Sequence, residues 1–375
     1  MSARVLMIAD RDFAVREHGL LERVERGISG PGLDIARAVP VGVHGWDVSS
    51  LTAMIEYDDS SGLFRAFTAP DAIHEALAGG GREAVFASGR PVDIVHAWGI
   101  GAYRIAMAVA HDCEASLVID VSSEYAMSEL RRLRKGVAEL LEYDGPRVCV
   151  VAADEALAAM AQARLPDADA RVVPWGVPVP KESREPRDED APVSISVMCT
   201  GRSRRDVVRA LDAIAEVRTA HERVIVFLDE QALDRTASIH RHIEAVGLDD
   251  CLSVIGNMES ARHLILETDV LVAPDTRHEH RSLVIEALAH GMRVVAHSGG
   301  FLPEPVDRRP YALVPRGDTH ALAAAIGAAL TADEEASHDA RRYATSGHTV
   351  RAHVRGVLEA YESLIGAPSV PITSG

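Results

Sequence analysis

The chain has 375 residues, about twice the length of a typical single domain, so two domains are expected. Hydrophobic residues account for 47% of the sequence, which is enough to build a sizeable core in each domain. The formal net charge of −17 argues against nucleic acid and against an anionic membrane as the main partner, because both would repel such a chain.

Targeting and redox signals are missing from the sequence. The four cysteines are scattered and form neither a metal-ligand spacing nor a disulfide framework, which fits a reducing compartment. The first residues lead directly into an apolar strand, without the basic, apolar and cleavage-site succession of a signal peptide. No apolar run approaches the roughly 20 residues that a membrane-spanning helix needs. These features predict a cytoplasmic protein with no transmembrane segment and no bound metal.

The first half of the chain alternates between apolar runs of strand length and helical stretches, the pattern of a parallel α/β domain. A glycine-rich segment, Gly27 to Gly32, separates the first predicted strand from the first predicted helix. Gly30 and Gly32 could let the backbone approach a ligand closely, although a plain loop fits the same composition. The predicted strands are residues 4–9, 91–99, 115–120 and 147–152, and the predicted helices are residues 33–39, 124–141 and 154–163.

The second half repeats this pattern after a break. Residues 178–191 are rich in proline and charge and have no apolar face, which is the composition of a linker. A strand, a loop with Gly201 and three arginines, a helix and a second strand follow, which is a parallel α/β opening. Outside residues 268–305, the predicted strands of this half are 193–199, 224–228 and 251–255, and the predicted helices are 207–218, 239–246, 319–330 and 350–365.

Residues 268–305 carry the most informative pattern in the chain. A short apolar strand ends at Pro274, and a polar loop leads to Ser282, which is a good N-cap for the apolar helix that follows. The helix stops at Gly291, and a second buried strand leads to a Gly-Gly turn. A parallel strand-helix-strand unit places the N–H groups of the helix N-terminus at the carboxyl edge of the sheet, where anionic ligands bind.

This block resembles the donor-binding segment of the group 1 glycosyltransferases (glycosyltransferase family 4), which are retaining enzymes with the GT-B fold. The matching positions are Asp269, Pro274, Glu286-Ala287, Gly291, Val294 to Ala296 and Gly299-Gly300. Further matches lie in the Gly201-Arg202 loop, in the Gly256-Asn257 turn and in the strand that contains His96. The resemblance extends over nearly the whole chain.

The resemblance implies an α/β fold of the GT-B type, with two Rossmann-like domains facing each other across a cleft and a C-terminal helix that crosses back to the first domain. The expected parts are an acceptor-side domain over residues 1–177, a linker over 178–191, a nucleotide-sugar domain over 192–345, a crossover helix over 346–366 and a tail over 367–375.

It also implies roles for residues of the second domain. Glu286 would bind the ribose hydroxyls of a sugar nucleotide, and the backbone N–H groups at Ser282 and Leu283 would face its phosphates. Arg202 and Arg205 would hold the diphosphate, with Arg205 in place of the family's lysine, although both arginines could simply solvate an exposed turn. The remaining expected contacts to the donor are Gly201, Gly256, Asn257, Gly299, Gly300 and, at the sugar, Glu279, which stands one place later than the family's first glutamate.

Residues of the first domain would serve catalysis or the acceptor. His96, at the carboxyl end of its strand, could orient a sugar hydroxyl or a phosphate, and the alternative is a packed core histidine. Asp120 and Glu124 could touch the acceptor together with Gly30 and Gly32, and the alternative for the two acidic residues is a solvated loop.

The implied reaction is metal-independent transfer of a sugar, with retention, from a nucleotide-diphosphate donor to a hydroxyl of a glycan, lipid-linked or small-molecule acceptor. No cofactor is expected beyond the donor substrate. Because fold alone does not determine function, two other possibilities remain at this point: a non-catalytic GT-B protein that binds a nucleotide or glycan, and a sugar-nucleotide epimerase.

Overall fold

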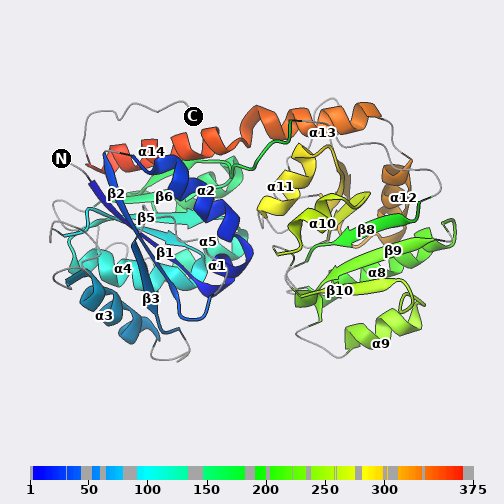
Figure 1. Ribbon diagram of the computed structural model, residues 1–375, viewed down its shortest axis with the longest axis horizontal. Helices are drawn as coiled ribbons and strands as arrows, with labels where there is room; N and C mark the ends of the chain where they lie inside the picture. Colours follow the sequence, from blue (N-terminus) through cyan, green and yellow to red (C-terminus); the bar gives the residue numbers. More distant parts are fainter. Residues whose placement is uncertain are drawn as a thin grey trace. The chain divides into compact units, whose positions relative to one another are not determined.

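The protein forms two compact units, each built on one parallel sheet (Figure 1). Unit 1 comprises Met1–Gly176 and Val350–Gly375, and unit 2 comprises Val177–Thr349. The computed structural model describes residues 3–30, 32–43, 53–59, 65–78, 91–133, 147–181, 191–199, 203–221, 223–233, 238–256, 258, 260–274, 281–298, 302, 311–331 and 334–365. Most of the predicted linker and the whole predicted tail lie outside these ranges.

The sheet of unit 1 has seven strands in the order β3-β2-β1-β4-β5-β6-β7, and every pairing is parallel. The strands are β1 Ala3–Ala9, β2 Leu33–Pro40, β3 Ala53–Tyr57, β4 Ile94–Trp98, β5 Ser116–Val121, β6 Val148–Ala152 and β7 Asp169–Val172. The helices are α1 Arg11–Arg16, α2 His18–Ile28, α3 Arg65–Ala78, the 3-10 turn η2 Ile100–Ala102, α4 Tyr103–Asp112, α5 Glu124–Arg132, α7 Glu155–Arg164 and α14 Val350–Ile365.

The prediction of a helix over residues 33–39 is wrong, because this segment is strand β2. Its charged residue, Arg37, is buried and forms an ion pair with Glu25 of α2, at 2.8 Å between Nη1 and Oε2. An arginine inside an apolar strand breaks the pattern expected of a strand that is buried on both faces. Glu25 pairs with this arginine inside the fold, and that tertiary contact leaves no mark in the local sequence.

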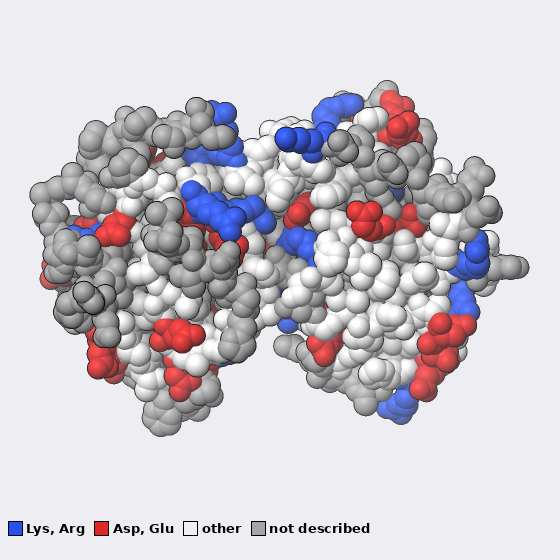
Figure 2. Space-filling model, in the orientation of Figure 1, with Lys and Arg blue, Asp and Glu red and all other residues white. Residues whose placement is uncertain are grey.

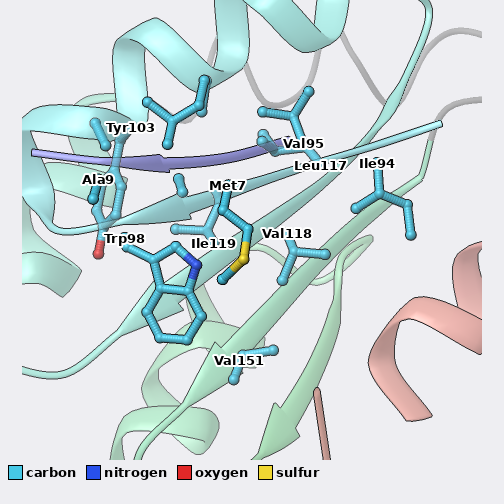
Figure 3. Packing of buried hydrophobic residues seen from close by; sticks show 14 of the residues in the cluster. Met7, Ala9, Ile94, Val95, Trp98, Tyr103, Leu117, Val118, Ile119 and Val151 are labelled. Carbon is cyan, nitrogen blue, oxygen red and sulfur yellow. The ribbon is translucent and has the colours of Figure 1, made fainter. Parts of the chain in front are cut away.

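The core of unit 1 fills both sides of its sheet. Helices α2 and α14 lie on one side, and α3 and α4 lie on the other (Figure 1). In Figure 3 the indole of Trp98 lies beside Met7, on the same side of the sheet as Val118 and Val151. The last helix, α14, buries the apolar side of its amphipathic surface in this core, so the chain returns to its first unit at its end.

The sheet of unit 2 has six strands in the order β10-β9-β8-β11-β12-β13, again all parallel. The strands are β8 Val193–Val197, β9 Val224–Asp229, β10 Leu252–Ile255, β11 Val270–Ala273, β12 Arg293–His297 and β13 Ala312–Val314. The helices are α8 Arg204–Arg218, the 3-10 turn η3 Glu230–Ala232, α9 Ser238–Ala245, α10 Arg262–Leu266, α11 Ser282–Ala289, α12 Thr319–Leu330 and α13 Glu334–Gly347.

Two apolar layers cover the sheet of unit 2. Helices α8, α9 and α12 pack on one face, and α10, α11 and α13 pack on the other. This is the doubly wound arrangement that alternating strands and helices predict. The sequence-based expectation of an α/β fold with two Rossmann-like units is thus confirmed.

The visible surface carries charges of both signs. Acidic and basic side chains of the described residues are interspersed on the face drawn in Figure 2. Among the described helices, none is both long enough and apolar enough to span a bilayer.

Candidate functional site

The candidate site lies at the carboxyl edge of the second sheet, where the strand order reverses. β8 pairs with β9 on one side and with β11 on the other, so the connections that follow β8 and β11 leave in opposite directions. Ligands of open α/β sheets bind outside the carboxyl ends of the strands at such a switch point. Helix α8 follows β8 and helix α11 follows β11, so both helices begin at this edge.

Helix α11 is apolar apart from Ser282 and Glu286, and each of its eight residues is buried. It ends before Gly291, whose φ of 74° is a backbone conformation that favours glycine. The sequence predicts Ser282 as the N-cap, but the structure has Ser282 as the first helical residue, after an extended Arg281 that makes no side-chain capping bond. The hydroxyl of Ser282 therefore serves a contact other than capping.

That contact is with Arg262, the first residue of α10. Its Nη2 donates a hydrogen bond to Ser282 Oγ at 2.9 Å, and its Nη1 forms an ion pair with Glu286 Oε2. Ser282 and Glu286 are four residues apart on α11, so their side chains share one face of the helix. One guanidinium thus bridges the side chains of two residues to which the resemblance assigns donor contacts, Glu286 through its carboxylate and Ser282 through its backbone N–H.

Glu286 is strongly buried, with 6% of its surface exposed. Its Oε2 is bound by Arg262, whereas its Oε1 has no hydrogen-bond donor among the described residues. A carboxylate oxygen accepts hydrogen bonds and cannot donate them when ionised. Oε1 is therefore the oxygen of this group that is most open to a hydrogen bond from a hydroxyl of a ligand.

The first turn of α8 contributes positive charge to the same edge. Arg204 and Arg205 are exposed, and the next residue, Asp206, is buried and bound by Arg316 Nε at 3.1 Å. Burial alone would raise the pKa of Asp206, but hydrogen bonds from Arg316 and Ser203 outweigh it and lower that pKa. The ion pair fixes the start of α8 and with it the position of the Arg205 backbone.

Gly256 lies at the same edge, after β10 and two strands from the switch point. It is exposed, and a Cβ at this position would lie 3.2 Å from Glu230 Oε2, which follows β9. Leu283, the second residue of α11, is buried, so its expected contact with phosphate is through the backbone. Six predicted site residues lie outside the described ranges: Gly201, Arg202, Asn257, Glu279, Gly299 and Gly300.

The structure gives His96 a place in the core of unit 1. It is fully buried on β4, its Nδ1 shares a 2.8 Å hydrogen bond with the Tyr361 hydroxyl of α14, and its ring lies 4.3 Å from that of Trp98. Burial, and then the neighbouring His353, lower the pKa of His96 well below its ordinary value. This is the packed core histidine that the sequence left open as an alternative.

Asp120 and Glu124 are close in the chain but lie in different environments. Asp120, on β5, is 1% exposed and accepts a hydrogen bond from Trp175 Nε1 at 3.3 Å. Burial raises the pKa of Asp120 to about 8 despite this hydrogen bond. Glu124 is the exposed first residue of α5, and the helix is capped by Ser123, whose Oγ accepts from Ala126 N.

The expected position of Gly30 and Gly32 is wrong. Helices α1 and α2 follow β1 directly, so these glycines precede β2 instead of following β1. Gly32 O accepts from Ala3 N at the start of β1, which places it at the amino edge of the sheet, opposite to the carboxyl edge. The error arises because residues 11–28 look like a charged loop, whereas they form two helices that bury Leu20, Leu21 and Val24.

Two residues at the sheet edges were missed. Arg262 has no local signal, because its helix of five residues is too short to show periodicity. Asp10 caps α1 through Oδ1, and its Oδ2 accepts from Gly101 N at 2.6 Å, which joins the carboxyl ends of β1 and β4. An aspartate between a strand and a helix is a recognisable N-cap signal, so Asp10 could have been found.

No group of three or more potential metal ligands occurs in the described part of the chain.

A comparison with models of sequence families gives a match within the second unit. Residues 194–332 match the family model described as "Glycosyl transferases group 1", and this range includes Arg262, Ser282 and Glu286. Among curated proteins, no sequence matches this chain.

Solved structures match the chain over nearly its full length. A sucrose-phosphate synthase from Thermosynechococcus elongatus has a TM-score of 0.72 and 15% identity, covering 98% of this chain and 100% of its own. HepE of Anabaena in complex with UDP-glucose has a TM-score of 0.69 and 14% identity, covering 97% and 100%. WaaG, a glycosyltransferase involved in lipopolysaccharide biosynthesis, has a TM-score of 0.69 and 13% identity, covering 97% and 100%. At these identities the likeness concerns the fold. Residues 194–332 thus match the group 1 glycosyltransferases, on a chain that has the two-unit GT-B fold of the glycosyltransferases it resembles.

Proposed function

We propose that this protein is a cytoplasmic glycosyltransferase that moves a sugar from a nucleotide-diphosphate donor to an acceptor hydroxyl, with retention and without a metal ion. The observation that carries the proposal is the grouping of Ser282, Glu286 and Arg262 at the switch point of the second sheet. The match of residues 194–332 to the group 1 family supports it.

The donor would be bound by two features of α11. Glu286 Oε1 would accept a hydrogen bond from a ribose hydroxyl, because Arg262 binds the other carboxylate oxygen and Oε1 has no donor in the described part of the chain. The first N–H groups of α11 would face the phosphates, since a helix N-terminus favours anions. The structure of HepE in complex with UDP-glucose supports this class of ligand.

The chemical demand of the reaction is the negative charge that grows on the departing diphosphate. Arg202 and Arg205, on the segment that begins α8, and the N-terminus of α11 would stabilise that charge. Glu279, in the segment that precedes α11, would contact the transferred sugar. His96 takes no part in this proposal, because it is enclosed in the core of unit 1.

Binding and turnover test the proposal in two steps. Titration calorimetry with UDP, GDP and ADP is expected to give saturable binding to one of them, and Glu286→Gln is expected to weaken it. Incubation with the corresponding nucleotide sugars in EDTA is expected to release the nucleoside diphosphate slowly, since water can replace the acceptor. If none of the three nucleotides binds and no nucleotide sugar is cleaved, the proposal is wrong. Binding without cleavage would instead identify a non-catalytic nucleotide-binding protein.

A further inference from the structure

We propose that Arg262 is a positioning residue of the donor site, which makes nucleotide affinity depend on the ribose hydroxyls by holding Glu286 with a single oxygen free. This inference rests on the proposed function, because it concerns how the same carboxylate meets the donor. Arg262 belongs to none of the positions through which the chain resembles its family, and it comes from a different helix than Glu286.

The geometry gives Arg262 two acceptors on one face of α11. Nη1 is paired with Glu286 Oε2, and Nη2 bonds Ser282 Oγ at 2.9 Å, one helical turn towards the N-terminus. The side chains of Arg262 and Glu286 are 14% and 8% exposed, so solvent screens this ion pair less than it would a surface pair. A planar guanidinium that binds two fixed points has little freedom left to turn.

The consequence for Glu286 is a fixed orientation. A glutamate side chain that must be immobilised on binding lowers affinity, and an ion pair already present in the free protein removes that entropic cost. Because Oε2 already accepts from Arg262, Oε1 is the oxygen with both lone pairs open to the ribose among the described residues. A carboxylate held in this way favours a ribose that presents its hydroxyls over a 2′-deoxyribose, which has lost a donor.

A second role for Arg262 predicts a different result. The guanidinium has five N–H donors, so it could also bind a donor phosphate directly. In that case Arg262 would contribute to affinity even in a protein that lacks the Glu286 carboxylate. A positioning residue, in contrast, loses its effect when the group it positions is removed.

The experiment is a double-mutant cycle of Arg262→Met and Glu286→Gln. Dissociation constants are measured by calorimetry for the nucleoside diphosphate that binds the wild type and for its 2′-deoxy form. Arg262→Lys is the conservative variant, because an ammonium can pair with Glu286 but lacks the planar fork. Arg218→Met is the matched control, since Arg218 forms an exposed ion pair with Asp250 in the same unit. Far-UV circular dichroism and thermal unfolding verify that each variant is folded.

We expect Arg262→Met to weaken nucleotide binding roughly 10- to 100-fold, the effect of a misplaced binding group, and to bring the ribose and deoxyribose affinities closer together. Arg262→Lys is expected to lie between the wild type and Arg262→Met. In the Glu286→Gln background, adding Arg262→Met should alter affinity by less than about threefold, because coupled residues are not additive. With a nucleotide sugar, KM should rise while kcat stays nearly constant, as expected for lost ground-state binding.

Each failure has a separate meaning. If the wild type binds no nucleoside diphosphate, the proposed function itself fails. If the wild type binds but Arg262→Met binds as tightly and discriminates as well, only the positioning role is overturned. The positioning role is also overturned if Arg262→Met weakens binding by the same factor with and without the Glu286 carboxylate, because that outcome assigns Arg262 to the phosphates.

Discussion

Tyr361 of α14 and His96 of β4 share a hydrogen bond of 2.8 Å although 265 positions of sequence separate them. Both side chains are buried in the core of unit 1. Burial lowers the pKa of His96 and raises the pKa of Tyr361, so both are uncharged at neutral pH. The pair ties the last helix of the chain to the central part of the first sheet.

Tyr361→Phe is expected to destabilise unit 1 by about 1–3 kcal/mol, because it leaves His96 Nδ1 buried without its partner. All three tryptophans of the chain belong to unit 1, so urea unfolding followed by tryptophan fluorescence reports on this unit. Tyr125→Phe, at an exposed tyrosine of the same unit, is the control. An unfolding midpoint equal to that of the wild type would contradict the prediction, and nucleotide affinity should be unchanged.

For the buried Glu25–Arg37 pair, we expect the stability losses of two single substitutions not to add up in the double variant. Burial raises the pKa of Glu25 to about 7, partly offset by Arg37, and it lowers the pKa of Arg37. Arg37→Met or Glu25→Leu alone should cost about 3–5 kcal/mol, because each removes the ion-pair partner of a buried charge. The double variant should recover most of this loss, since apolar residues of similar size replace both charges. Guanidinium unfolding of the four proteins measures the coupling, and additive losses would refute it.

Because Asp120 is buried, we expect the folded protein to lose stability as pH rises. Its pKa in the folded protein is about 8, raised by burial from an ordinary value of 3.8, so the folded state holds the proton more tightly. Its contribution is therefore complete below about pH 4 and is lost as pH rises towards 8, at up to about 1.4 kcal/mol per pH unit. Asp120→Asn should remove this slope, and Asp71→Asn, at an exposed aspartate of α3, should keep it. Parallel curves of stability against pH for wild type and Asp120→Asn would contradict the assignment.

Arg202→Ala is expected to lower the rate of nucleotide-sugar cleavage by on the order of 10²–10³, because one donor to the leaving diphosphate is lost. The fold should be intact, because a charged arginine between β8 and α8 is not expected to fill a hydrophobic core. Thermal unfolding checks the fold, and turnover at saturating donor checks the rate. A purified variant with turnover like that of the wild type would refute the role of Arg202.

The elements that sequence patterns predict best are the buried strands. Their apolar runs are continuous because helices cover both faces of each sheet, as in β11 and β12. Strand β2 was mistaken for a helix because a charged residue, Arg37, interrupts its apolar run. Its partner, Glu25, lies on helix α2 and cannot be recognised from the local sequence. Helices α1 and α2 were missed because their charged residues outnumber the apolar ones that face the core.

The candidate site was predictable only in part. The family pattern and the turn spacing on α11 identify Ser282 and Glu286, which the structure brings to one face of that helix. Arg262 was not predictable, because it lies 24 positions before Glu286 and meets it only through the packing of α10 on α11. His96 looked like an edge residue in the sequence, but α14 covers it, and this contact spans most of the chain.

The return of α14 to unit 1 has a consequence for biosynthesis. Val357, Ala360 and Tyr361 fill part of the core of the first unit, yet they are made after all of unit 2. A nascent chain that leaves the ribosome from its N-terminus can complete unit 2 while unit 1 still lacks a helix. The part of the protein that is translated first is thus the last to be finished, and a premature stop before residue 350 would leave its core open.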